Sequence, residues 1–142
     1  MMFFIGILSG LILIVISIFH VYWAFGGRYA VDAVIPTQTN KKRVLNAPPF
    51  LTFLVAVFVM LIAITYLHEA NFYDFQFLPE FIKEYGLTIF ASIFFIRAVG
   101  DFKYVGFFKK IKSTKFGIND TKFFSPLCLF LALSGVLILI LK

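Results

Sequence analysis

Residues 3–25 read FFIGILSGLILIVISIFHVYWAF and contain no Asp, Glu, Lys or Arg. A helix of roughly 20 apolar residues crosses the bilayer core of about 30 Å. Three more apolar stretches follow, at residues 49–67, 85–99 and 123–141, with loops of ordinary polarity between them. We therefore predict an all-α integral membrane protein built as a four-helix bundle.

Composition leaves little chain for a separate soluble domain. Of the 142 residues, 61% are hydrophobic, and the mean hydropathy is +0.97. Because so short a chain cannot cover four apolar helices with polar shells, lipid must be the outer solvent, and we predict one domain over residues 1–142. The first stretch has no Lys or Arg before it and no small-residue cleavage site after it, so we expect a retained span rather than a signal peptide.

Basic residues gather in the first and third connections between these stretches. The first connection carries Arg28, Lys41, Lys42 and Arg43, and the third has Arg97, Lys103, Lys109, Lys110, Lys112, Lys115 and Lys122 in or beside it. The second connection is acidic, with Glu69, Asp74, Glu80 and Glu84 against Lys83. Since short loops rich in Lys and Arg stay in the cytoplasm, we expect the basic connections inside and both termini outside. This orientation accounts for the net charge of +6 without a nucleic-acid partner.

Proline and polar residues predict where helices begin. Asn46 precedes Pro48, which suits a helix start and predicts a second helix from about Pro48 to His68. Pro79 is expected to open the third helix. For the last helix the sequence leaves two starts open, one capped by Asn119, Asp120 or Thr121 and one capped by Ser125.

The third connection contains a stretch with helical periodicity. Apolar side chains recur at i, i+3, i+4 and i+7, namely at Tyr104, Phe107, Phe108 and Ile111. This spacing predicts a short amphipathic helix lying on the cytoplasmic membrane surface. We expect the basic residues of this segment to contact the headgroups of anionic lipids. They are Lys103, Lys109, Lys110 and Lys112.

Polar residues inside spans are candidates for function, because they are expensive in lipid. His20 lies near the cytoplasmic end of the first helix, and Arg97 near that of the third. Asp101 follows Arg97 by four residues and would share its helix face if the helix continued through Gly100. The plainer alternative is that Arg97 reaches the lipid phosphates while His20 donates one hydrogen bond to a nearby carbonyl.

Other chemistry finds little support in the sequence. The topology puts His68 at the outer end of its helix, far from His20, so the two cannot share a metal ion. Cys128 is the only cysteine, which excludes an internal disulfide and favours a packing role. No phosphate-binding loop, nucleophile elbow or dinucleotide fingerprint is present, so we expect no metal, no cofactor and no common catalytic site.

Five blocks of the sequence resemble those of a known family. They are residues 20–27 (HVYWAFGG), 34–36 (VIP), 97–109 (RAVGDFKYVGFFK), 120–121 (DT) and 125–128 (SPLC). Together they resemble a small bacterial membrane family catalogued as domain of unknown function 3995. The resemblance implies four spans and a bacterial cytoplasmic membrane, and it brings no established activity.

These observations favour a non-enzymatic binding or accessory protein. Its pocket near the cytoplasmic side would accept an amphipathic or anionic small molecule or a lipid, and the candidate residues are His20, Tyr22, Trp23, Arg97, Asp101, Asp120 and Ser125. One alternative is a membrane enzyme in which His20 acts as acid or base and Arg97 stabilises an anion. Another is a structural subunit or small oligomeric transporter, for which Gly6 and Gly10 would supply the contact between copies.

Overall fold

The computed structural model describes residues 1–38, 40 and 47–142, and these form helices, turns and loops without a β-strand. The basic residues Lys41, Lys42 and Arg43 and the expected cap Asn46 lie outside the described residues. In chain order the elements are α1 (Met2–Ala24), α2 (Val31–Val34), α3 (Pro49–Glu69), the π-helical turn η1 (Ile82–Gly86), α4 (Leu87–Val99), α5 (Lys115–Asn119), the π-helical turn η2 (Asp120–Phe124) and α6 (Ser125–Leu141).

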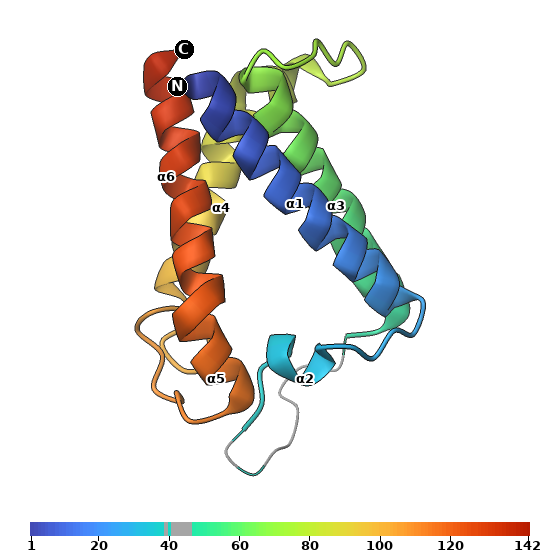
Figure 1. Cartoon of the computed structure of the whole chain (residues 1–142), viewed down its shortest axis with the longest axis vertical. Helices are drawn as coiled ribbons and strands as arrows, with labels where there is room; N and C mark the ends of the chain where they lie inside the picture. The colour runs from blue at the N-terminus through green and yellow to red at the C-terminus, as the bar shows by residue number, and fades with distance from the viewer. Residues whose placement is uncertain (39, 41–46) are drawn as a thin grey trace.

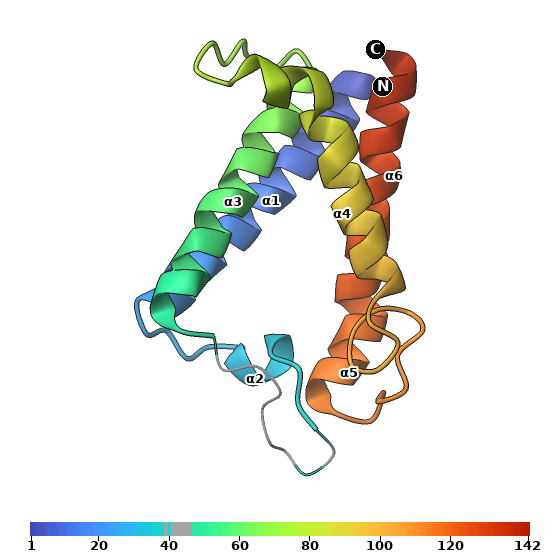
Figure 2. The ribbon, with the colours of Figure 1, turned by 180° about the vertical axis from the view of Figure 1, so that it is seen from behind.

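The long helices form two pairs that diverge from a common apex. α1 packs along α3, and α4 packs along α6 (Figures 1 and 2). The pairs meet at the end that holds both termini and the connection between α3 and η1. At the other end they stand apart, and α2 lies between them and contacts α5. The molecule therefore has the outline of a narrow triangle.

Three helical segments are long and apolar enough to cross a membrane, judged by length and composition among the described residues. They are Met2–Ala24, Pro49–Glu69 and the continuous segment Lys115–Leu141. This matches a helical membrane protein. The expected third span is not among these three segments. Helical structure there starts at Glu80, directly after Pro79 as predicted, passes through η1 and ends at Val99.

Glycines bring α1 and α3 close together. A Cβ atom added at Gly6 would lie 2.3 Å from the Cβ of Ala70, and one added at Gly10 would lie 2.7 Å from the side chain of Leu67. Ser17 adds a polar contact, donating a hydrogen bond of 2.8 Å to the carbonyl of Ala56. The Gly6–Gly10 face, from which we expected a contact between copies, therefore packs against the end of α3 within the chain.

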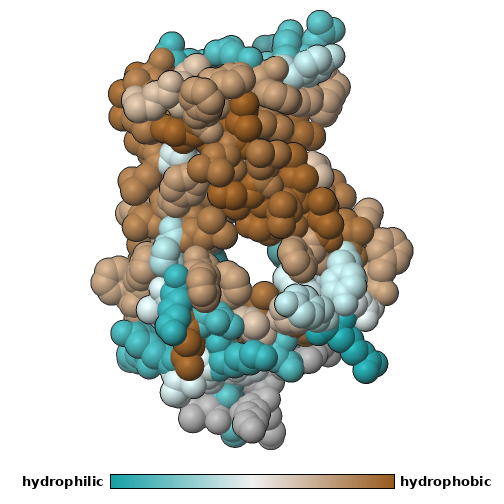
Figure 3. Space-filling view, viewed as in Figure 1, coloured by the Kyte–Doolittle hydropathy of each residue, from teal (hydrophilic) through white to brown (hydrophobic). Residues whose placement is uncertain are grey.

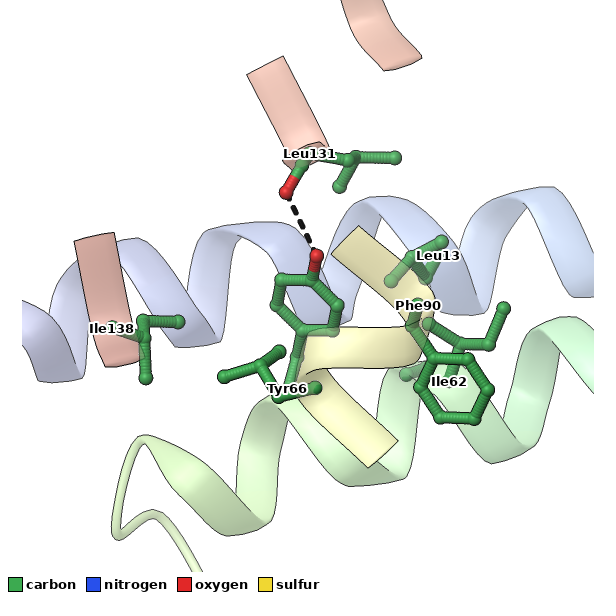
Figure 4. Packing of buried hydrophobic residues seen from close by; sticks show 8 residues of the cluster. Leu13, Ile62, Tyr66, Phe90, Leu131 and Ile138 are labelled. Carbon is green, nitrogen blue, oxygen red and sulfur yellow. Dashed lines mark hydrogen bonds between the residues drawn. The ribbon is translucent and has the colours of Figure 1, made fainter. Parts of the chain in front are cut away.

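The apex is a buried cluster shared by both pairs (Figure 4). Tyr66 of α3 is fully buried, and its hydroxyl donates a hydrogen bond of 2.7 Å to the carbonyl of Leu131 in α6. Ser9 of α1 donates to the hydroxyl of Ser134 in α6 over 2.9 Å. These bonds join helices of different pairs, so the apex fixes how the pairs are oriented at this end.

The segment after α4 is not the predicted amphipathic helix. Residues 101–112 form an irregular loop. Gly100 and Gly106 have φ values of +88° and +89°, which L side chains rarely adopt, and their backbones touch. The carboxylate of Asp101 accepts three backbone N–H groups that an α-helix would use otherwise. Local hydrogen bonding thus overrides the helical periodicity of the aromatic residues.

The last helix begins earlier than either predicted start. Its N-cap is Thr114, whose hydroxyl oxygen accepts a hydrogen bond of 3.0 Å from the N–H of Gly117. The helix then runs through η2 into α6 without a break. The wider π-helical turn ends at Phe124, two residues before Pro126, which has no N–H to donate and would crowd the preceding turn of an α-helix. Asn119, Asp120, Thr121 and Ser125 are therefore inside the helix and do not cap it.

Candidate functional site

A buried carboxylate is the centre of the candidate site. Asp120 lies in η2 and is fully buried. One of its oxygens, Oδ1, accepts a hydrogen bond of 2.8 Å from Arg97 Nη2. The other, Oδ2, accepts from the N–H of Gly106 at 2.8 Å, from Lys109 Nζ at 3.0 Å and from the Ser125 hydroxyl at 3.1 Å. The carboxylate thus joins α4, α6 and the loop between them.

Lys109 is the second buried member of the site. Its side chain is 0% exposed, which is rare for lysine and requires that all three N–H groups find acceptors. The ammonium donates to the carbonyl of Gly106 at 2.9 Å, to Asp120 and to the hydroxyl of Thr121 at 2.7 Å. The expected contact of Lys109 with lipid headgroups is therefore wrong. Lys103, Lys110 and Lys112, the other three lysines of that prediction, are exposed.

Arg97 completes the cluster and leaves one nitrogen without a partner. Its side chain is 32% exposed, and Nη2 pairs with Asp120. The other terminal nitrogen, Nη1, is buried and has no hydrogen-bond partner among the described residues. Arg97 and Lys109 bring two positive charges and Asp120 one negative charge, so one positive charge remains uncompensated.

Asp101 does not pair with Arg97, contrary to the i, i+4 prediction. Gly100 ends α4, and the chain turns away before Asp101. Partial burial raises the pKa of Asp101, but hydrogen bonds from the N–H groups of Val105, Lys103 and Tyr104 outweigh this effect and hold the pKa below its ordinary value of 3.8. Asp101 therefore organises the loop that delivers Gly106 and Lys109 to Asp120.

The residues predicted from the first helix lie on the other helix pair. His20 Nδ1 is 2.8 Å from the carbonyl oxygen of Ile16, which is the one hydrogen bond that the plainer alternative expected of His20. The His20 ring packs against Trp23. Trp23 Nε1 donates a hydrogen bond of 2.8 Å to the carbonyl of Tyr29. The Tyr22 hydroxyl accepts a hydrogen bond of 3.4 Å from the N–H of Tyr29. Tyr22 and Trp23 thus hold the loop that follows α1, and neither contacts Arg97.

The two sets of residues lie on different helix pairs, which an opening separates. Figure 3 shows an opening that passes through the molecule between the helix pairs, above α2. His20 follows Ser9 by about three helical turns and shares the face of α1 that meets α6 at the apex. Arg97 shares a face of α4 with Phe90 and Phe94, which belong to or pack against the apex cluster. From helix periodicity we infer that both faces continue from the apex toward the opening.

Sequence reasoning found Arg97, Asp120 and Ser125, and it missed the roles of Gly106, Lys109 and Thr121. Lys109 and Lys110 are adjacent and chemically alike, so the sequence could not tell which of them turns inward. The available signal was charge balance, because a carboxylate beside an apolar helix needs a cation. Within the described part of the chain, no group of three or more His, Cys, Asp or Glu residues could hold a metal ion.

Comparison with known proteins agrees with the sequence blocks. The family model described as a protein of unknown function, DUF3995, matches residues 13–135. This range covers α1 from its middle through most of α6 and includes the whole Arg97–Lys109–Asp120 cluster. No curated protein and no solved structure matches the chain. The chain belongs to the DUF3995 family of proteins of unknown function.

Proposed function

We propose that this chain is a non-enzymatic protein of the bacterial cytoplasmic membrane that binds an amphipathic anionic molecule or lipid. The apolar part of the ligand lies between the two helix pairs, and its anionic head lies at Arg97. The observation that carries this proposal is the opening between the pairs in Figure 3. At membrane depth such a space is filled by apolar groups, because water there would lose hydrogen bonds.

The charge of the polar cluster supports an anionic head. One positive charge is left after Asp120 is paired, and Arg97 Nη1 has no acceptor. A buried donor without a partner costs about 1–3 kcal/mol, and a hydrogen bond from a guanidinium to an anion is among the stronger ones in proteins. A phosphate or carboxylate at Nη1 would satisfy both the donor and the charge.

We further propose four membrane spans, with α4 as the fourth. η1 and α4 contribute 5 and 13 residues, about 27 Å of helix. Their outward side chains include Ile89, Ile93 and Ile96, all exposed in the isolated chain and suited to lipid. The α2–α5 end would face the cytoplasm because Lys and Arg are concentrated near it, and the end with both termini would face outward.

The other two functions have less support. An enzyme would need His20 and Arg97 to act on one bond, yet they are on different helix pairs and share no contact. An oligomer built through Gly6 and Gly10 would need a face that packs against α3. The binding proposal needs neither condition, because a long amphipathic ligand reaches both walls of the gap.

Two matched isoleucines test whether the gap is the binding site. Ile16 lies on the His20 face of α1, whereas Ile18 lies on roughly the opposite face and is exposed. We expect Ile16→Trp to fill part of the gap and reduce co-purifying lipid at least about tenfold, while Ile18→Trp leaves it unchanged. Native mass spectrometry of the purified protein measures the bound species. Equal lipid retention in both variants would rule out the gap as the site.

A conservative substitution tests the head position. In Arg97→Lys the single ammonium group can still pair with Asp120, but the second donor nitrogen, which the proposal assigns to the anionic head, is lost. We expect this variant to fold and to lose its preference for anionic over zwitterionic lipid in mixed vesicles. Lys112→Gln, at an exposed position, is the control for general surface charge. An unchanged preference in Arg97→Lys would place the head elsewhere.

The orientation is tested by labelling in intact cells. Single cysteines at Asn71 and Ser113, in a Cys128→Ala background, lie at opposite ends of the molecule. We expect a membrane-impermeant thiol reagent added outside to label Asn71→Cys and to spare Ser113→Cys. The opposite pattern would invert the protein and remove the cytoplasmic assignment of Arg97.

A further inference from the structure

A second polar site lies at the opposite end of the molecule from Arg97. It is a pocket of about 420 Å³ formed by the end of α3, the connection that follows α3, η1 and the end of α6. This volume falls within the range of about 300–1,000 Å³ that is usual for small-molecule sites. The pocket shares no residue with the Arg97–Lys109–Asp120 cluster, so it is independent of the function proposed above.

One wall of the pocket is an ion pair between a buried carboxylate and a half-exposed ammonium group. The side chain of Glu69 is 3% exposed, and its carboxylate lies 2.7 Å from Lys142 Nζ. The pair links the end of α3 to the end of α6. Because each charge compensates the other, this wall adds no net charge to the pocket.

A second wall presents an imidazole nitrogen and a carboxylate oxygen close to each other. His68 Nδ1 is buried and has no hydrogen-bond partner among the described residues. Asp74 Oδ1 lies 3.7 Å from it, too far for a direct hydrogen bond. When the imidazole carries its proton on Nε2, Nδ1 is an acceptor, and a primary ammonium group placed between the two atoms donates one N–H to Nδ1 and another to the carboxylate. This wall therefore suits the amino end of a ligand.

The pocket also offers a cation for the other end of the ligand. Lys83 lines the pocket, and its ammonium is 3.1 Å from Glu80, whose side chain is 89% exposed. An ion pair with so exposed a partner is weak and exchanges readily for another anion. The lining therefore holds one acceptor pair and one available cation, and its charges balance between Glu69 and Asp74 on one side and Lys83 and Lys142 on the other.

We propose that this pocket binds an α-amino acid, with the ammonium group between His68 Nδ1 and Asp74 and the carboxylate at Lys83. A zwitterion matches a lining of balanced charge better than a ligand with net charge, because both ends are paired when it binds. The remaining volume holds the side chain. The site is a binding site, and no covalent step is part of the proposal.

Three related probes test which charged ends are recognised. L-glutamine carries both ends, N-acetyl-L-glutamine lacks the ammonium group, and L-glutaminamide lacks the carboxylate. We expect isothermal titration calorimetry on the protein in lipid nanodiscs to detect L-glutamine binding, with each analogue at least about tenfold weaker. Equal binding of all three probes, or no binding of L-glutamine, would overturn the proposal.

Variants of the two walls assign the contacts. His68→Phe keeps a planar ring without the nitrogen, and Lys83→Gln removes the cation. We expect both to weaken L-glutamine binding about tenfold or more, and Lys83→Gln to leave the affinity for L-glutaminamide unchanged, because that probe has no carboxylate. Lys112→Gln, at the other end of the molecule, should bind L-glutamine as the parent does. If Lys83→Gln weakens both probes equally, Lys83 does not hold the carboxylate and the assignment fails.

Discussion

The two helix pairs are held together in different ways. α1 and α3 approach each other through Gly6 and Gly10, with one serine hydrogen bond between them. α4 and α6 are joined at their far end by a buried aspartate with two cations. Lipid is as apolar as the helices, so apolar burial does not drive either pair together, and each needs close packing or polar bonds. The first pair uses backbone shape, and the second uses charge.

This difference has a consequence for the gap. Close packing through Gly6 and Gly10 is a direct contact of α1 with the end of α3 and needs no loop. The charged cluster depends on residues 100–112, because Gly106 and Lys109 come from that loop. Damage to the loop should therefore open the second pair and leave the first intact, and the substitutions below test this from the largest effect to the smallest.

Removal of the central charge should have the largest effect. Asp120→Asn keeps the shape of the side chain but leaves Lys109 buried without an anion. Breaking a buried ion pair costs about 3–5 kcal/mol. Because Arg97 is partly exposed, we expect a loss of about 3 kcal/mol of unfolding free energy, measured by denaturation in mixed detergent micelles.

Adjacent lysines provide the matched control for that experiment. Lys109 is buried and Lys110 is exposed. Lys109→Met should destabilise the protein strongly, because Gly106, Asp120 and Thr121 each lose a donor, while Lys110→Met should change stability by less than about 0.5 kcal/mol. If the two variants unfolded alike, the cluster would not be what joins α4 to α6.

Overpacking of the first pair should have the second-largest effect. In Gly6→Ala the new methyl group meets the Cβ of Ala70 at 2.3 Å, so the helices must separate. Such overpacking costs about 1–3 kcal/mol. The same measurement on Gly6→Ala combined with Ala70→Gly should recover most of the loss. Leu8→Ala, on the exposed face of α1, is the control, and a loss as large in that variant would argue against close packing at Gly6.

The bond between the pairs at the apex should contribute less. Ser9→Ala and Ser134→Ala each remove the hydrogen bond of 2.9 Å that joins α1 to α6. Hydrogen bonds between membrane helices average about 0.6 kcal/mol in double-mutant cycles, and we expect a coupling energy of that size. Ser92→Ala, an exposed serine that bonds within its own helix, should show no coupling with Ser134→Ala. A coupling energy near zero for Ser9 and Ser134 would mean that this hydrogen bond does not hold the apex, which would then depend on apolar packing and on the bond from Tyr66 to Leu131.

The smallest effect should be confined to the loop after α4. Asp101→Ala removes the acceptor of three N–H groups, so the amides of Lys103, Tyr104 and Val105 should exchange hydrogen faster. The pKa of Asp101 is lowered in the folded protein, so this stabilisation is present above the ordinary value of 3.8 and is lost as pH falls through the folded pKa. The exchange protection of these three amides should therefore become the same in the parent protein and in Asp101→Ala at low pH. Asp101→Asn keeps an oxygen acceptor and should lie between them, and protection that stays the same in Asp101→Ala would exclude this role.

Much of the architecture could be predicted from the sequence alone. Apolar length located the three helices that could span a membrane, Pro79 marked the start of the helical segment before α4, and the blocks at residues 20–27 and 97–109 indicated the family. Arg97, Asp120 and Ser125 were identified as site residues because polar groups in apolar helices need partners. These features are local, since each depends on residues close together in the chain.

Only the tertiary structure decided which charged side chains pair with one another. Arg97 could have paired with Asp101, four residues away, but Gly100 turns the chain and Asp120 receives the guanidinium. Lys109 is buried and Lys110 is exposed, although the two are chemically alike and adjacent. Residues 104–111 have the aromatic spacing of a helix but form a loop. The gap between the pairs likewise follows from how the apex contacts angle the helices. Local pattern sets which segments are helical, whereas ion pairs and gaps depend on residues brought together from distant parts of the chain.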